Sequence, residues 1–152
     1  MSMFHSMNIT ASALTAQRLR MDVVSSNMAN ADTTRAKYVD GQWEPYRRKS
    51  VVMEPKENSF SSYMEVAMGT HNENSIGNGV KVTNIVEDET PFQLVYDPEH
   101  SDADADGYVK MPNVDPLREM VDLMSATRSY EANVTVLNAS KNMLMKALEI
   151  GK

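Results

Sequence analysis

The stretch that decides the fold lies at the end of the chain, where residues 113–152 read NVDPLREMVDLMSATRSYEANVTVLNASKNMLMKALEIGK. Asp115 is a good N-cap residue, and Pro116 suits the first helical position because its missing N–H would be unpaired there. Residues 117–150 contain no glycine or proline, and Gly151 favours a turn after them. The stretch therefore predicts one helix of about 35 residues.

The predicted helix is longer than a compact globule of this chain would be. At about 1.5 Å per residue it would extend about 52 Å, whereas a compact chain of 152 residues has a radius of gyration of about 15 Å. It also carries a seam with the four-and-three spacing of a coiled coil, with two polar interruptions. The seam consists of Leu123, Thr127, Tyr130, Val134, Leu137, Lys141, Leu144 and Leu148.

A second apolar seam lies about 160° round the same helix, if each residue turns it by about 100°. This seam consists of Ala132, Val136, Ala139, Met143, Ala147 and Ile150. A helix that is apolar on two opposite sides needs neighbours on both, although an ordinary core helix of one domain is the alternative. We expect Leu137, Leu144 and Leu148 of the first seam to pack within the chain. We expect Val136, Ala139 and Met143 of the second seam to contact other subunits.

Residues 7–29 predict another uninterrupted helix, rich in Ala, Leu and Met. One of its seams consists of Met7, Ala11, Leu14, Met21 and Met28, interrupted by Arg18 and Ser25. The opposite seam consists of Ile9, Ala13, Ala16 and Val23, whose alanines permit close helix approach. Asn27 and Asn30 then predict a turn, because Asn tolerates the left-handed cap and competes locally for backbone hydrogen bonds.

Between the helices the pattern changes to the alternation typical of strands. Extended runs are expected at residues 43–54, 80–87, 92–96 and 108–111, and residues 58–79 predict a long loop or small insertion. The expected fold class is α+β, with long N- and C-terminal helices that pair as an antiparallel coiled coil and a small central β-rich module. The expected segments are an N-terminal assembly helix at 1–34, the module at 35–112 and a C-terminal assembly helix at 113–152.

Composition narrows the range of partners. The 41% of hydrophobic residues allow one domain with a modest core, and the net charge of −6 disfavours nucleic acid and anionic membranes as partners. The cationic run at residues 46–49 is explained by a solvated strand edge. The absence of cysteine excludes disulfides, thiol nucleophiles and Cys-ligated zinc. Because no stretch approaches 18 apolar residues and no cleaved signal is visible, we expect no direct membrane insertion and export by another route.

One acidic segment matches half of a known metal site. Asp102, Asp104, Asp106 and Gly107 fit the first half of an EF-hand calcium loop. The closing position falls on Asn113, which cannot supply a bidentate carboxylate, so an acidic turn is the simpler interpretation. The three histidines share no metal-ligand spacing, and no serine lies in a nucleophile motif. We therefore expect no catalytic activity, no cofactor and no metal site.

Four motifs together resemble the bacterial flagellar basal-body rod family, and among its members the proximal rod subunits. These motifs are SALTAQRL at 12–19, SNMANA at 26–31, YVKMPNV at 108–114 and SYEAN at 129–133. The resemblance covers roughly the first 40 and last 60 residues, in the right order, whereas residues 58–79 look longer than the family pattern. The passage ADGYVKMPNV at 105–114 favours the proximal members over other rod and hook proteins.

The resemblance implies a structural subunit that is exported through the flagellar type III apparatus without signal cleavage. Its terminal helices would stack with copies of itself and with other rod proteins into a hollow rod that crosses the periplasm and transmits torque from motor to hook. Contacts with the membrane-embedded ring and the export gate are also implied. The alternatives are another rod or hook protein, an acidic calcium-binding module, and an unrelated coiled-coil adaptor or export chaperone.

Overall fold

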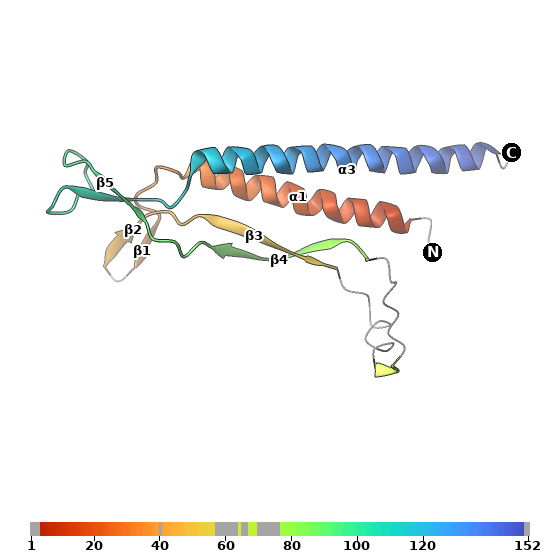
Figure 1. Ribbon diagram of the computed structural model, residues 1–152, viewed down its shortest axis with the longest axis horizontal. Helices are drawn as coiled ribbons and strands as arrows, with labels where there is room; N and C mark the ends of the chain where they lie inside the picture. The colour runs from red at the N-terminus through yellow and green to blue at the C-terminus, as the bar shows by residue number, and fades with distance from the viewer. Residues whose placement is uncertain (1–3, 40, 57–63, 65–66, 70–76, 151–152) are drawn as a thin grey trace. The chain divides into compact units, whose positions relative to one another are not determined.

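The computed structural model describes residues 4–39, 41–56, 64, 67–69 and 77–150. Within these residues two long helices, α1 (His5–Ala29) and α3 (Pro116–Ile150), flank six strands in sequence (Figure 1). The α+β class is confirmed. The chain divides into two compact units, and each helix contributes to both. Unit 1 comprises Met1–Leu19, Val52–Asn84 and Thr127–Lys152, and unit 2 comprises Arg20–Val51 and Ile85–Ala126.

Both helices form where local signals predict them. The Asp115 carboxylate accepts a 3.0 Å hydrogen bond from the backbone N–H of Leu117, which is the predicted N-cap of α3. The helix then continues for 35 residues without a break. α1 begins two residues earlier than predicted, at His5, and ends at Ala29 as predicted. Asn30 closes it, because its side-chain amide donates to the carbonyl of Ser26 at 2.9 Å.

The strands form three separate pairs rather than one sheet. The hairpin of β1 (Lys37–Val39) and β2 (Gln42–Glu44) is antiparallel, as is that of β5 (Gln93–Tyr96) and β6 (Tyr108–Met111). β3 (Lys49–Pro55) pairs with β4 (Val80–Glu87), and the two run in opposite directions (Figure 1). β4 and β6 have the predicted bounds, and β5 begins one residue later than predicted.

The single strand predicted at 43–54 is wrong, since β2 and β3 divide it. Pro45 has no N–H for a strand ladder, and the next N–H, that of Tyr46, donates instead to the carbonyl of Thr33 at 3.0 Å. Most of the loop or insertion predicted at 58–79 lies outside the described residues.

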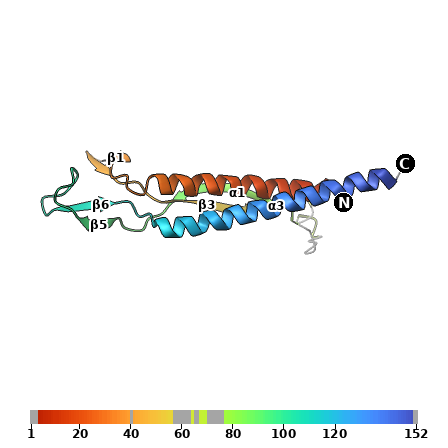
Figure 2. The same cartoon turned by 90° about the horizontal axis from the view of Figure 1, so that it is seen from above.

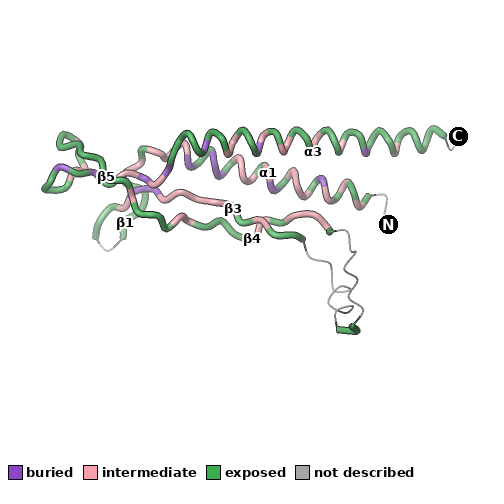
Figure 3. The backbone as a smooth tube through the Cα atoms, viewed as in Figure 1, coloured by how far each residue is buried: buried purple, intermediate pink, exposed green. Residues whose placement is uncertain are grey.

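Most of the buried residues, which Figure 3 colours purple, belong to unit 2. There the end of α1 lies beside the start of α3, and the two helices run in opposite directions (Figure 2). The apolar part of this core consists of Val23, Val24, Tyr46, Val109, Val114 and Ala126. Two of its fully buried side chains, Asn27 and Glu119, are polar.

In unit 1 the start of β4 lies very close to α1. Gly79 precedes β4 with a positive φ of 99°, and a Cβ there would lie 2.2 Å from Oγ of Ser12 on α1. That hydroxyl accepts a 3.1 Å hydrogen bond from the backbone N–H of Val80. A glycine at 79 therefore lets the start of β4 rest against α1.

Candidate functional site

The predicted second seam of α3 is exposed along its length. Val136 is 52% and Met143 67% exposed, and Ala132, Ala139, Ala147 and Ile150 are exposed as well. Apolar surface of this kind on a helix is typical of a site that another helix covers.

The predicted first seam of α3 is covered over most of its length. Its half-buried members are Leu123, Thr127, Tyr130, Val134, Leu137 and Leu144. Leu148 is 75% exposed, so its predicted packing within the chain is wrong. The reason is that the last helical residues of α3, from 145 to 150, are all exposed.

On α1 the alanine-rich seam is the more deeply covered one. Ala16 and Val23 are buried, and Ile9 and Ala13 are half-buried. In the other seam Ala11 is exposed and four residues are half-buried, namely Met7, Leu14, Met21 and Met28. Ala13 and Ala16 therefore place small side chains on the covered face, and the close helix approach that they permit stays a prediction.

Sequence reasoning missed a further apolar patch at the start of α3. Leu117, Met120, Val121 and Met124 are all exposed. At about 100° per residue they lie on the side of the helix opposite the fully buried Glu119. Their i, i+3, i+4, i+7 spacing is a helical stripe that could have revealed the patch, although it lies outside the predicted seam, which begins at Leu123.

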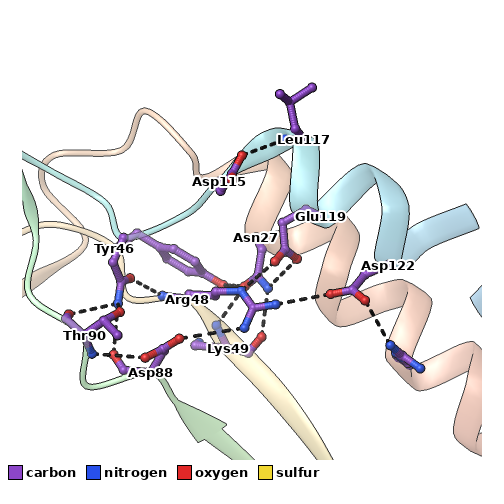
Figure 4. Close-up of polar contacts among 12 residues, drawn as sticks. Asn27, Tyr46, Arg48, Lys49, Asp88, Thr90, Asp115, Leu117, Glu119 and Asp122 are labelled. Atoms are coloured by element: carbon purple, nitrogen blue, oxygen red, sulfur yellow. Dashed lines mark hydrogen bonds and ion pairs between the residues drawn. The ribbon is translucent and has the colours of Figure 1, made fainter. Parts of the chain in front are cut away.

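The predicted turn residue Asn27 is instead the centre of a polar cluster (Figure 4). Its side-chain N–H groups donate to the carbonyl of Lys49 at 2.8 Å and to Glu119 at 2.9 Å. Its side-chain oxygen accepts from the Lys49 N–H at 2.9 Å and from the Tyr46 hydroxyl at 3.1 Å. All four bonds of this amide are made, and they tie the end of α1 to β3 and α3.

Arg48 completes the cluster at the position just before β3. Its Nε donates to Glu119 at 2.6 Å, and Nη2 donates to Asp122 at 3.3 Å. Asp122 also accepts a 3.1 Å bond from Arg20 on α1, and Asp88 lies 3.8 Å from Arg48 Nη1. The Arg48 side chain is only 14% exposed, so the solvated edge predicted for residues 46–49 is wrong. The buried carboxylate of Glu119 requires a cation beside it.

Asn113, part of a family motif, connects the same region to the turn after β4. Its side-chain oxygen accepts a 2.8 Å bond from the backbone N–H of Arg48. Its amide nitrogen donates to the carbonyls of Asp88 and Thr90 at 3.0 and 3.1 Å. This position therefore holds three backbone segments together.

The acidic segment at 102–107 forms the turn between β5 and β6. Asp102 accepts hydrogen bonds from Arg35 and from the Thr34 hydroxyl, and the Arg35 bond in particular holds the pKa of Asp102 below its usual range. Gly107 takes a positive φ of 81°, and its N–H donates to the Asp104 carbonyl at 2.8 Å. Within the described residues no group of three or more His, Asp or Glu side chains is placed to hold a metal ion.

Two other carboxyl groups of unit 2 also have a lowered pKa. Glu87 is ion-paired at 2.6 Å with Lys37, and that hydrogen bond lowers the pKa of Glu87. Hydrogen bonds from Thr90 lower the pKa of Asp88. Among the helical residues that the structure describes, none forms a span with the length and hydropathy of a membrane-crossing helix.

Comparisons with known proteins match both ends of the chain to family models. Residues 7–37 match the model described as flagella basal body rod protein. Residues 105–150 match the model described as flagellar basal body rod FlgEFG protein C-terminal. These two segments contain all of α1 except its first two residues, and the whole of β6 and α3.

Relatives match the chain along its whole length. It is 65% identical over 152 residues to the flagellar basal-body rod protein FlgC of Bacillus subtilis, covering 100% of both chains. It is 45% identical over 154 residues to FlgC of Borreliella burgdorferi, covering 99% of this chain and 98% of the relative. It is 45% identical over 152 residues to FlgC of Escherichia coli O157:H7, covering 100% of both.

The full coverage of both chains corrects one expectation, since residues 58–79 are not an extra insertion relative to the Bacillus subtilis protein. The sequence identity of 65% extends over the entire length, and family models match both ends of the chain. Two unrelated chains that are merely both rich in helix would not share this much sequence. The chain belongs to the FlgC family of flagellar basal-body rod proteins.

Proposed function

We propose that the terminal helices of this rod protein build the shaft of the flagellum. The chain is a structural subunit of the flagellar basal body, in the proximal rod. In our proposal α1 and α3 pair as an antiparallel coiled coil within each subunit and stack with the helices of neighbouring subunits into a hollow rod. The rod transmits torque from motor to hook.

The observation that carries this proposal is the exposed second seam of α3. Val136 and Met143 are more than half exposed, while Leu137 and Leu144 on the other side of the helix are half-buried. A helix with one covered and one uncovered apolar side has the surface that lateral packing requires. We assign contacts between subunits to Ala132, Val136, Ala139 and Met143, and we add the patch at the start of α3 to them.

The other proposed contacts follow the two helices. On α1 the less covered seam of Met7, Leu14, Met21 and Met28 also faces neighbours, whereas Ile9, Ala13, Ala16 and Val23 pack within the subunit. On α3 Leu123, Tyr130, Val134, Leu137 and Leu144 support the same internal packing. In this division residues 1–34 and 113–152 are assembly segments, and 35–112 is a module between them.

The surroundings of the subunit follow from its place in the rod. We propose that the rod spans the periplasm and that the subunit reaches it by type III export, without cleavage of a signal. Its partners are copies of itself and other rod proteins, and at the rod base the membrane-embedded ring and the export gate. The net charge of −6 is compatible with a protein surface as partner.

A gene-replacement experiment tests the function. The chain is expressed in a Bacillus subtilis strain that lacks its own FlgC, and basal bodies are purified and imaged by cryo-electron microscopy. We expect swimming to be restored and the chain to be found in the proximal rod, with α1 and α3 lining the tube. Export of the chain without its incorporation into basal bodies, together with cells that do not swim, would refute the proposal.

A further inference from the structure

The polar cluster of Asn27, Arg48, Glu119 and Asp122 is an unusual way to fill the space between the end of α1 and the start of α3. Asn27 and Glu119 are fully buried, and the Arg48 side chain is 14% exposed. Buried ion pairs of this kind are often no more stable than apolar side chains of similar volume. Their best-attested use is to exclude alternative packing arrangements, as a single polar residue does in a coiled coil.

The covered face of α3 gives a reason why alternatives must be excluded. It repeats with the same four-and-three spacing over five intervals, and its buried or half-buried members are Ala126, Tyr130, Asn133, Leu137, Ser140 and Leu144. A shift of α3 by seven residues, about 10 Å, brings this face back onto an equivalent one. Because most of these side chains are small or polar, apolar packing alone discriminates weakly between such registers.

The contacts of the cluster distinguish the observed register of α3 from the shifted ones (Figure 4). Two of its contacts join α1 directly to α3, from Asn27 to Glu119 at 2.9 Å and from Arg20 to Asp122 at 3.1 Å. Arg48, just before β3, donates to both acidic residues. In a shifted register Glu119 loses Asn27 and Arg48 together, and a buried carboxylate without partners is strongly unfavourable.

We propose that this cluster is a register lock, which sets the axial position of α3 relative to α1 and β3. Its consequence for assembly rests on the proposed function. A regular rod can form only if every subunit presents the second seam of α3 at the same axial position. The lock itself is a property of the isolated chain. The four residues are positioning residues, and their side chains contact no other subunit in this account.

The test is a distance measurement between spin labels in unit 2. The chain contains no cysteine, so Ser25→Cys and Val121→Cys, both at exposed positions, can be labelled without background. Pulsed electron paramagnetic resonance should give one narrow distance in the otherwise unmutated chain. Arg48→Met with Glu119→Met keeps a similar side-chain volume and removes the contacts of Glu119 and Arg48, leaving only the Arg20–Asp122 pair. This lock variant should add a second distance population that reflects an axial shift of about 10 Å.

The matched control removes an exposed ion pair of the same charges. Lys37→Met with Glu87→Met removes the 2.6 Å pair between β1 and β4, and it should keep the single distance. The lock variant should unfold within about 5 °C of the unmutated chain, since apolar replacement is close to neutral in stability. A single narrow distance in the folded lock variant would overturn the proposal.

Two further outcomes are also decisive. If the lock variant does not fold, Glu119→Gln replaces it, and a single distance in that variant overturns the proposal while a second distance supports it. In cells the lock variant should not swim, whereas the control should. If neither the control nor the unmutated chain supports swimming, the proposed function fails, and the distance result still stands on its own.

Discussion

The carboxylate of Glu119, fully buried in the first turn of α3, accepts a 2.6 Å hydrogen bond from Nε of Arg48, which precedes the first residue of β3. The two residues are 71 positions apart in the sequence. The contact joins the start of one terminal helix to the central strands, and Asn27 joins the end of the other helix to the same carboxylate. The helix ends and the strands therefore depend on one another.

Asn27 should be the most sensitive uncharged position in this cluster. Replacement by Ala removes four hydrogen bonds, so the buried Glu119 keeps only its bond from Arg48, and the Lys49 N–H and carbonyl lose their bonds to the Asn27 side chain. We expect the free energy of unfolding to fall by about 3 kcal/mol. Asn30→Ala, which removes bonds that are partly exposed, should cost about 1 kcal/mol. Urea unfolding of both variants measures the difference, and equal losses would contradict this role for Asn27.

Gly79 should tolerate no larger residue. Gly79→Ala places a Cβ 2.2 Å from Oγ of Ser12 at a φ of 99°, so we expect a loss of about 3 kcal/mol in unfolding free energy. Gly41→Ala is the control, because φ is 85° there and nothing lies within 4 Å, and it should cost only about 1 kcal/mol. Adding Ser12→Ala should recover part of the Gly79→Ala loss. Additive losses in thermal unfolding would argue against the close approach.

Asp102 should make the free energy of unfolding depend on pH in the acidic range. Its pKa is lowered by hydrogen bonds from Arg35 and Thr34, so the unfolded chain binds a proton at higher pH than the folded chain does. The stabilisation is complete above the ordinary carboxyl pKa of about 4, and it is lost as pH falls through the lowered pKa. Arg35→Gln should raise the pKa of Asp102 toward its usual value in an NMR titration. Glu87, paired with Lys37, should not change, and an unchanged Asp102 would contradict this cause.

The same turn should not bind calcium at physiological levels. Asp102 is already engaged by Arg35 and Thr34, and Asn113, at the closing position of the half-matched loop, bonds to Arg48 and Thr90. The closing carboxylate that calcium requires is therefore missing. Calorimetric titration should give no heat of binding. A micromolar dissociation constant would restore the calcium-binding interpretation.

Local signals were enough to predict the helices. Asp115 and Pro116 mark the start of α3, and the absence of glycine and proline after them predicts its length. The break between β2 and β3 could also have been inferred from Pro45. Neither periodicity nor capping reveals that Arg48 is drawn into the core, because that depends on Glu119 being buried 71 residues later. Contacts over such distances are determined by tertiary packing, which local sequence does not encode residue by residue.

The second seam of α3 shows the same limit of sequence-based prediction at the candidate site. Its existence follows from the spacing of Val136, Ala139 and Met143, and these residues are exposed in the single chain. Whether the first or the second seam of α3 faces outward depends on the side chains of α1 that pack against it. Leu148, the last residue of the first seam, is 75% exposed, and no residue in the described chain covers it.

The central claim, that the exposed seam of α3 builds the rod, is tested most directly by a charge at Ala139. Ala139→Glu puts a carboxylate on an exposed position, so the isolated chain should keep its stability. In the assembled rod an unpaired buried charge costs several kcal/mol at every repeated contact. Asn138→Glu is the control, because it places the same charge on another exposed face about 100° away.

The decisive measurement is swimming of cells that carry either variant as their sole copy, with basal bodies isolated from both. The account predicts that the Ala139→Glu protein is expressed and exported but absent from basal bodies, and that the cells do not swim, whereas Asn138→Glu cells do. Normal swimming of Ala139→Glu cells, with the variant present in intact rods, would contradict the claim.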